Sequence, residues 1–239
     1  MSKYLITNLG GSKTVTPKEV RVNHAFDLGW IKGVVFDKKY QHSENFCWDA
    51  NGGAFVVGTP LLKDVNNIAE YIYRDFTEDK IPLYKREIIG MWAVFVYKEG
   101  KAFCFNDYWG LYDICYNCNV DNSFVVSTSL ADVHANMLNA SIDEYPFVMD
   151  NFQLGAFPGD TMFKEIKRLK KEQYLKITES KFSVRELTNY RFNYIFKSKE
   201  QAIQDIVAYG KLLSVVIAKR FRKTAVAMTG GLDSRLVFS

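Results

Sequence analysis

The chain has 239 residues, of which 48% are hydrophobic and 24% are charged, the composition of a folded globular protein and not of a disordered one. Its net charge of +4 comes from 31 basic and 27 acidic residues, a balance too even to indicate nucleic-acid binding. No apolar run approaches the roughly 18–20 residues that span a bilayer, and the four cysteines do not make a disulfide framework, so we expect a cytoplasmic protein without nucleic-acid or membrane partners.

Strand and turn signals dominate the first 130 residues. Residues 52–58 form a short apolar run bounded by glycines, which is typical of a strand. The apolar runs 91–97 and 102–105 flank a polar turn at 98–101 that contains glycine, and this pattern predicts a hairpin. Residues 123–127 are a further strand candidate.

Two helices are predicted before residue 160. Between residues 65 and 76 the apolar side chains recur with the i, i+3, i+4 spacing of an amphipathic helix. A second helix is predicted over 142–154, because acidic residues suit its start and Gly155 suits its end. The alternation in 173–177 then predicts another strand.

The clearest helix signal comes late in the chain. Ser198 is a good N-cap, and Gln201 three residues later completes the pattern of a capping box. Apolar residues continue with helical spacing to Phe221, after which 224–228 reads as a buried strand that leads directly into a Gly-Gly turn. A helix, a buried strand and a glycine-rich loop in this order predict the start of an α/β domain.

Cys115 and Cys118 have CxxC spacing. A zinc site would need two further ligands nearby in the sequence, and a redox site would place the pair at the start of a helix. Because aromatic and β-branched residues surround this pair, we interpret both as ordinary strand cysteines.

The loop that begins at Thr229 carries the clearest chemical signal. Gly230 and Gly231 follow a strand and allow successive backbone N–H groups to face an anion, and Thr229 and Ser234 add hydroxyl donors. A helix that starts near Asp233 would direct its positive end at the same anion, and the Asp233 carboxylate suits Mg²⁺. The order differs from the Walker A loop, because no lysine follows the glycines. A tight turn without a ligand is the alternative interpretation.

This loop resembles the pyrophosphate loop of N-type ATP pyrophosphatases, and three upstream segments resemble asparagine synthetases in the same order. They are FNDYWGLYDI at 105–114, FVVSTSLA at 124–131, and the stretch 154–169 that includes TMFKEIKRL. The resemblance to the asparagine synthetase family covers residues 90–239.

The resemblance implies an α+β fold in two parts. Residues 1–195 would form a glutaminase-type domain of the class II amidotransferase kind, an Ntn-hydrolase-like αββα sandwich of two antiparallel sheets. Residues 196–239 would begin the ATP-binding synthetase domain, with its first helix and strand only, so this segment alone should complete no synthetase reaction. The strand and loop within 222–239 would then be exposed, swapped or disordered.

The implied reaction is the ATP-dependent adenylation of a small-molecule or peptide carboxylate, followed by attack of an amine or ammonia. In that scheme Thr229, Gly230, Gly231 and Ser234 would bind the pyrophosphate, and Asp233 would bind Mg²⁺. The cofactors would be ATP and Mg²⁺, and the assignment allows for a homodimer.

The first residues depart from the family pattern. Its glutaminases use an N-terminal cysteine as nucleophile, whereas this chain has Ser2 and no cysteine before Cys47. The glutamine-binding stretch is also missing, since His24 to Asp27 match it poorly, and Asn51-Gly52 is a common turn dipeptide. We therefore expect that the glutaminase activity has been lost and that the domain is a scaffold.

Two alternatives remain open at this stage. Ser2 could act as an N-terminal hydroxyl nucleophile after removal of Met1, which would make the chain a serine hydrolase. The chain could instead be a non-enzymatic module that binds a partner, with a vestigial ATP loop.

Overall fold

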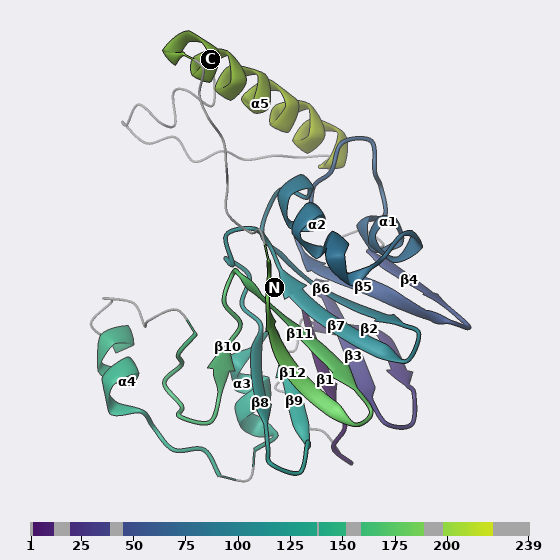
Figure 1. Ribbon diagram of the computed structural model, residues 1–239, viewed down its shortest axis with the longest axis vertical. Coiled ribbons are helices and arrows are strands. Elements are labelled where there is room, and N and C mark those ends of the chain that lie inside the picture. Colours follow the sequence, from purple (N-terminus) through teal and green to yellow (C-terminus); the bar gives the residue numbers. More distant parts are fainter. Residues whose placement is uncertain are drawn as a thin grey trace. The chain divides into compact units, whose positions relative to one another are not determined.

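The computed structural model describes residues 2–11, 20–38, 45–137, 139–151, 159–188 and 198–221 (Figure 1). The chain divides into two compact units, the first made of Met1–Pro60 with Asn66–Tyr190 and the second of Leu61–Val65 with Arg191–Ser239. The predicted strand at 224–228 lies outside the described residues, so the expected α/β start of a second domain stays a prediction.

The first unit contains two six-stranded sheets in which every assigned strand pair is antiparallel. Sheet A has the order β10-β8-β9-β1-β3-β2. Its strands are β1 (Lys3–Thr7), β2 (Val20–Asp27), β3 (Lys32–Lys38), β8 (Cys115–Cys118), β9 (Phe124–Ser127) and β10 (Lys167–Arg168).

Sheet B has the order β12-β11-β7-β6-β5-β4. Its strands are β4 (Phe46–Asp49), β5 (Gly52–Gly58), β6 (Trp92–Lys98), β7 (Lys101–Asn106), β11 (Gln173–Thr178) and β12 (Lys181–Glu186). The predicted hairpin is confirmed as β6 and β7, although its turn is only Glu99-Gly100, because Lys98 already pairs with Lys101. Both turn residues have positive φ, 54° and 72°, as the tight turn of a two-residue hairpin requires.

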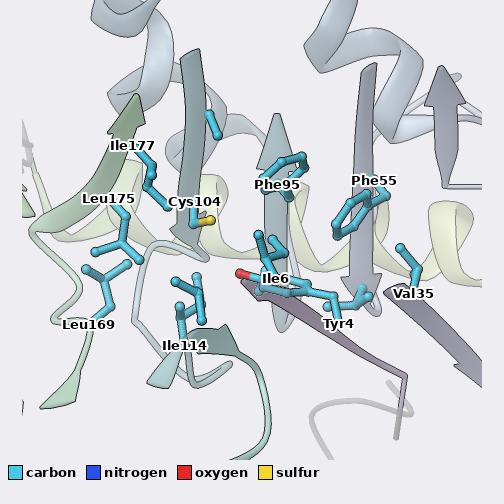
Figure 2. Close-up of a cluster of buried hydrophobic side chains, with 14 of the residues drawn as sticks. Tyr4, Ile6, Val35, Phe55, Phe95, Cys104, Ile114, Leu169, Leu175 and Ile177 are labelled. Carbon is cyan, nitrogen blue, oxygen red and sulfur yellow. The ribbon is translucent and has the colours of Figure 1, made fainter. Parts of the chain in front are cut away.

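The main core lies between the two sheets (Figure 2). Sheet A contributes side chains such as Tyr4, Ile6 and Val35, and sheet B contributes Phe55, Phe95, Cys104 and Leu175. Successive side chains of a strand point to opposite faces of its sheet, so every second residue of these strands points into the core between the sheets. The Phe55 and Phe95 rings stack here with centroids 4.9 Å apart.

Helices cover the outer faces of both sheets. Helix α1 (Ile68–Arg74) packs against β4, β5 and β6, and is followed by the short 3₁₀ helix η1 (Glu78–Lys80) and by α2 (Ile81–Glu87). Helix α3 (Leu130–Ala135) packs against β8 and β9 of sheet A, where Val133 joins a smaller core cluster. The first unit is therefore an αββα sandwich of two antiparallel sheets, and the predicted α+β class is confirmed.

Several helix boundaries differ from those predicted. The helix expected over residues 65–76 is shorter because Asn67 is its N-cap and accepts a hydrogen bond from the Glu70 backbone N–H at 3.1 Å. The helix expected over 142–154 is α4 (Glu144–Asn151), while Ile142 forms an isolated bridge with Phe163, and residues 152–158 lie outside the described residues.

The second unit contains the long helix α5 (Lys199–Arg220). The predicted N-cap is confirmed, since Ser198 Oγ accepts a hydrogen bond from Gln201 N at 3.1 Å, while the Gln201 side chain donates to Asp205 at 2.9 Å. By length and composition alone α5 could cross a membrane, with a mean hydropathy of 1.2 over 18 residues. Asp205 and Lys211 interrupt that window, and one such helix is weak evidence for a membrane protein.

Candidate functional site

Ser2 is the one sequence-predicted site residue that the structure describes. Thr229, Gly230, Gly231, Asp233 and Ser234 all lie outside the described residues. Their assigned roles in binding ATP and Mg²⁺ therefore stay predictions, and the geometry that follows concerns the surroundings of Ser2.

Ser2 lies directly before β1 and is almost completely enclosed, with 1% of its surface exposed. Its Oγ accepts a hydrogen bond from the backbone N–H of Gly58 at 2.8 Å. The Tyr112 hydroxyl donates to the carbonyl oxygen of Ser2. Residues from β5 and from the turn after β7 thus hold Ser2 at both its side chain and its backbone. We call the group Ser2, Gly58 and Tyr112 the Ser2 seat.

Gly58 ends β5 in a conformation that only glycine adopts easily, with φ at +102°. A Cβ at this position would lie 2.3 Å from the Met91 carbonyl oxygen and 2.8 Å from the Trp92 Cα. The close approach of β6 therefore requires glycine here, and it leaves the Gly58 N–H directed at Ser2. The sequence showed Gly58 only as the end of a strand, so its contact with Ser2 was missed.

Tyr112 is positioned by a turn that a single carboxylate organises. Asp107, which is 1% exposed, accepts hydrogen bonds from the backbone N–H groups of Trp109 at 3.0 Å, Leu111 at 3.1 Å and Tyr112 at 2.8 Å. Gly110 completes the turn with φ at +68°. The turn is fixed by these contacts, and the Tyr112 side chain points from it into the interior, where it is 4% exposed.

A buried lysine lies behind this turn. Lys85 on α2 is fully buried, and its Nζ donates to the Asn106 carbonyl oxygen at 2.6 Å and to Asn106 Oδ1 at 3.0 Å. Asn106 Nδ2 in turn donates to the Tyr112 carbonyl oxygen at 3.2 Å. Burial lowers the pKa of Lys85 to about 7, against the opposing effects of the Asp107 and Glu172 carboxylates.

The observed contacts of Ser2 fix its position at the start of β1. In an N-terminal nucleophile the base is the residue's own α-amino group, which removal of Met1 would free, so the neighbours of Ser2 need only position its hydroxyl. The two groups seen on Ser2 are an amide N–H and a phenol, and both act as donors to it. Ser2 lines neither of the two clefts that the described residues form on sheet B.

The cysteine pair lies on a strand, as predicted. Cys115 and Cys118 begin and end β8, where Cys115 is buried and Cys118 is exposed. Burial raises the pKa of both thiols, which does not favour the thiolate needed for metal binding or redox chemistry. Within the described ranges, no group of three or more His, Cys, Asp or Glu side chains could hold a metal ion.

Residues 24–27 and 51–52, which match the glutaminase pattern poorly, take part in packing and in a turn. The His24 ring stacks on the Phe46 ring with centroids 3.6 Å apart, which links the edge strands of the two sheets. Ala50 and Asn51 form the turn of the β4–β5 hairpin and Gly52 begins β5, and the Asn51 N–H donates to Asp49 Oδ1 at 2.7 Å.

The described residues also form two open clefts on sheet B. One, of about 680 Å³, lies between the η1–α2 segment and the end of β12, with Glu78, Tyr174 and Glu186 among its lining. The other, of about 660 Å³, lies beside α1 and includes Cys47, Tyr73 and Lys98. The second cleft places the Cys47 thiol near the Asp49 and Glu70 carboxylates, but burial and these two charges raise the pKa of the thiol, which disfavours its thiolate.

Comparison with known proteins finds a similarity to solved structures only. No family model and no curated protein matches the chain. Among solved structures it is similar to glutamine phosphoribosylpyrophosphate (PRPP) amidotransferase from B. subtilis complexed with ADP and GMP, with 12% sequence identity and a TM-score of 0.42. The match covers 78% of this chain and 43% of that chain, so this chain spans less than half the length of that protein.

Proposed function

We propose that the chain is the front part of an ATP-dependent, amide-forming ligase related to asparagine synthetases, in which the two-sheet domain has no glutaminase activity. The ligase would adenylate a small-molecule or peptide carboxylate, release pyrophosphate and transfer the acyl group to an amine or ammonia. The observation that carries the ligase assignment is the loop Thr229 to Ser234, which follows a buried-strand pattern.

The chemistry of that loop supports ATP as the ligand. The N–H groups of Gly230 and Gly231, with the hydroxyls of Thr229 and Ser234, are suited to the oxygens of a pyrophosphate. The Asp233 carboxylate is a hard oxygen ligand of the kind Mg²⁺ prefers, and the ion would neutralise phosphate charge.

The Ser2 seat supports the loss of glutaminase activity. A glutaminase of this family needs a thiol at this position and an open path for glutamine, whereas Ser2 carries a hydroxyl, is 1% exposed and holds two hydrogen bonds. A hydroxyl is also a much weaker nucleophile than a thiolate near pH 7. In our proposal the domain therefore serves as a scaffold for the synthetase part.

An assay of ATP–pyrophosphate exchange tests the ligase assignment. It uses the protein expressed from its own gene, and metabolites from a cell extract supply the carboxylate. Replacing Asp233 by Asn should abolish exchange without changing the circular dichroism spectrum, because the Mg²⁺ ligand is lost. Asp79→Asn, an exposed position on η1, should leave exchange unchanged. Normal exchange in the Asp233 variant would remove Asp233 from the site, and absence of saturable Mg·ATP binding would favour the partner-binding module.

Glutamate release from glutamine tests the other half of the proposal. We expect no release above background from the wild-type protein, and none from Ser2→Cys, because a thiol in the same enclosed seat has no better access to substrate. Release that is lost in Ser2→Ala would support the serine-hydrolase alternative. Release that appears only in Ser2→Cys would mean that the seat opens to glutamine and that only the thiol is missing.

A further inference from the structure

We propose that Asn51 is a site of spontaneous self-modification, at which attack by the backbone nitrogen of Gly52 converts the side-chain amide to aspartate and isoaspartate. The inference does not depend on the proposed ligase activity, because it concerns the β4–β5 hairpin of the two-sheet domain by itself.

The residue after Asn51 favours this attack. Asn51 is the only asparagine in the sequence that is followed by glycine. A side chain on the following residue would hinder the approach of its nitrogen to Asn51 Cγ, and glycine removes this hindrance. The fold itself requires the glycine, since Gly52 has a φ of +142° and a Cβ there would collide with the Tyr97 carbonyl oxygen. The packing of β5 against β6 therefore fixes the reactive pair in place.

The Asn51 side chain is free to reach the Gly52 nitrogen. Ala50 and Asn51 form an exposed turn between β4 and β5. The Asn51 backbone N–H donates to Asp49 Oδ1 at 2.7 Å, which holds the main chain of the turn. The side-chain amide, in contrast, makes no hydrogen bond with any described residue. Rotation about its side-chain bonds can therefore bring Cγ toward Gly52 N without the loss of a contact.

The main chain needs to open only locally for the attack. Asp49 and Gly52 are the last pair of the β4–β5 ladder, next to the turn. Strand β4 has four residues and is the outermost strand of sheet B in the described part of the chain (Figure 1). The end of a ladder at a sheet edge opens at a lower free energy than core strands do. The Gly52 nitrogen is thus released while the two sheets stay packed.

The reaction balances with water as its only co-reactant. The Gly52 nitrogen forms a bond to Asn51 Cγ, the bond between Cγ and Nδ2 breaks, and ammonia leaves with the proton from Gly52 N. The attack is intramolecular, so no second molecule has to be brought into position. Water then opens the cyclic succinimide. Opening at Cγ gives aspartate, and opening at the Asn51 carbonyl carbon gives isoaspartate, in which the main chain passes through Cβ and Cγ.

Conversion would add a carboxylate to the cleft beside α1, which Asn51 lines together with Asp49, Glu70 and Glu99. Burial and the charges of Glu70 and Asp49 already raise the pKa of Cys47 in this cleft, and a further charge acts in the same direction. Isoaspartate also lengthens the main chain at the turn. The hairpin has little room for this, because a Cβ on Gly53 would collide with the Cys47 carbonyl oxygen.

Peptide mass spectrometry of the complete folded chain tests the site. After prolonged warming at mildly alkaline pH, Asn51 should be converted before any other asparagine, and both aspartate and isoaspartate should be found. Asn122 is the internal control, because it is also exposed but is followed by Ser123, and its Nδ2 donates to the Ser180 carbonyl oxygen at 3.5 Å. In Asn51→Gln, conversion at this position should be lost, since the longer side chain would have to close a larger ring.

A destabilised variant shows whether the reaction belongs to the folded protein. Asp132→Asn removes one partner of the buried ion pair with Lys3, in the helix that covers sheet A. The rate at Asn51 should not change, because the hairpin in sheet B stays intact. If the rate rises in step with the unfolded fraction, if Asn122 is converted first, or if aspartate forms without isoaspartate, the proposal is overturned.

Discussion

Lys3 and Asp132 form an ion pair in the interior of the first unit, with Lys3 Nζ 2.9 Å from Oδ1 and 2.7 Å from Oδ2 of the carboxylate. The Asp132 side chain is fully buried and the Lys3 side chain is 10% exposed. Lys3 lies next to Ser2 in β1, and Asp132 lies in α3, so the pair joins the first strand to the helix that covers sheet A. The ion pair therefore holds β1 at Lys3, and the Ser2 seat holds the residue directly before it.

Removing one partner of this pair should be strongly destabilising. Asp132→Asn leaves the Lys3 ammonium buried without its counter-charge, and we expect a loss of about 3–5 kcal/mol in the free energy of unfolding. Urea denaturation followed by tryptophan fluorescence measures it. Lys32→Met provides the control, because Lys32 pairs with Asp27 at 3.0 Å in an exposed position. That variant should lose less than about 1 kcal/mol, and equal losses in both would contradict the interpretation.

Gly58→Ala should prevent stable folding or lower the unfolding midpoint strongly. The new Cβ would lie 2.3 Å from the Met91 carbonyl oxygen, and the left-handed φ adds about 1–2 kcal/mol of strain. Gly100→Ala separates the two effects, since Gly100 also has a positive φ of 72° but has no atom within 4 Å of the new Cβ. The thermal unfolding midpoints of the two variants show how much of the loss comes from the steric clash and how much from the backbone conformation. A Gly58 variant as stable as the Gly100 variant would show that β6 can move away.

Glu78 should make the free energy of unfolding depend on pH in the acidic range. Its carboxylate accepts hydrogen bonds from Tyr174 Oη at 2.5 Å and Lys176 Nζ at 2.6 Å. Burial by itself would raise the pKa of Glu78, but the bonds from Lys176 and Tyr174 outweigh it and lower the pKa below its ordinary value. The folded state thus gains stability above the unfolded pKa of about 4.3, and this gain is lost as pH falls through the lower folded pKa.

Comparison of Glu78→Gln with the wild type over pH 6 to 3 tests this dependence. The variant should be less stable at pH 6, and the difference between the two proteins should shrink as the solution is acidified. Glu99→Gln in the exposed turn of the β6–β7 hairpin is the matched control. A stability difference that stays constant down to pH 3 would show that Glu78 is not held in its charged form.

Local patterns predicted those parts of the fold in which neighbours in sequence decide the structure. The hairpin at 91–105 was recognisable because two apolar runs flank Glu99-Gly100, and α5 because Ser198 and Gln201 mark its start. Helix α2 was missed, since Lys85 occupies a buried position where a helical pattern would show an apolar residue. Asn106, 21 positions later in the sequence, supplies two acceptors for the Nζ of that lysine.

The candidate site was less accessible to sequence reasoning. Ser2 could be singled out by its place at the start of the chain, but its partners Gly58 and Tyr112 are separated from it by 56 and 110 positions. No periodic pattern connects residues so far apart, because their contact is created by the stacking of the two sheets. The ATP loop shows the reverse case, since its chemistry was recognised from consecutive residues and its geometry lies outside the described residues.

The position of β1 has a consequence for how the chain must assemble. This first strand is central in sheet A, with β3 on one side and β9 on the other, and its partner Val126 is 120 positions after Ile6. At ribosomal rates of about 5–20 residues per second, one edge of β1 stays unpaired for roughly 6–24 s after synthesis. The nascent chain therefore exposes an apolar strand edge over that time, and pairing between residues so far apart in sequence favours slow folding.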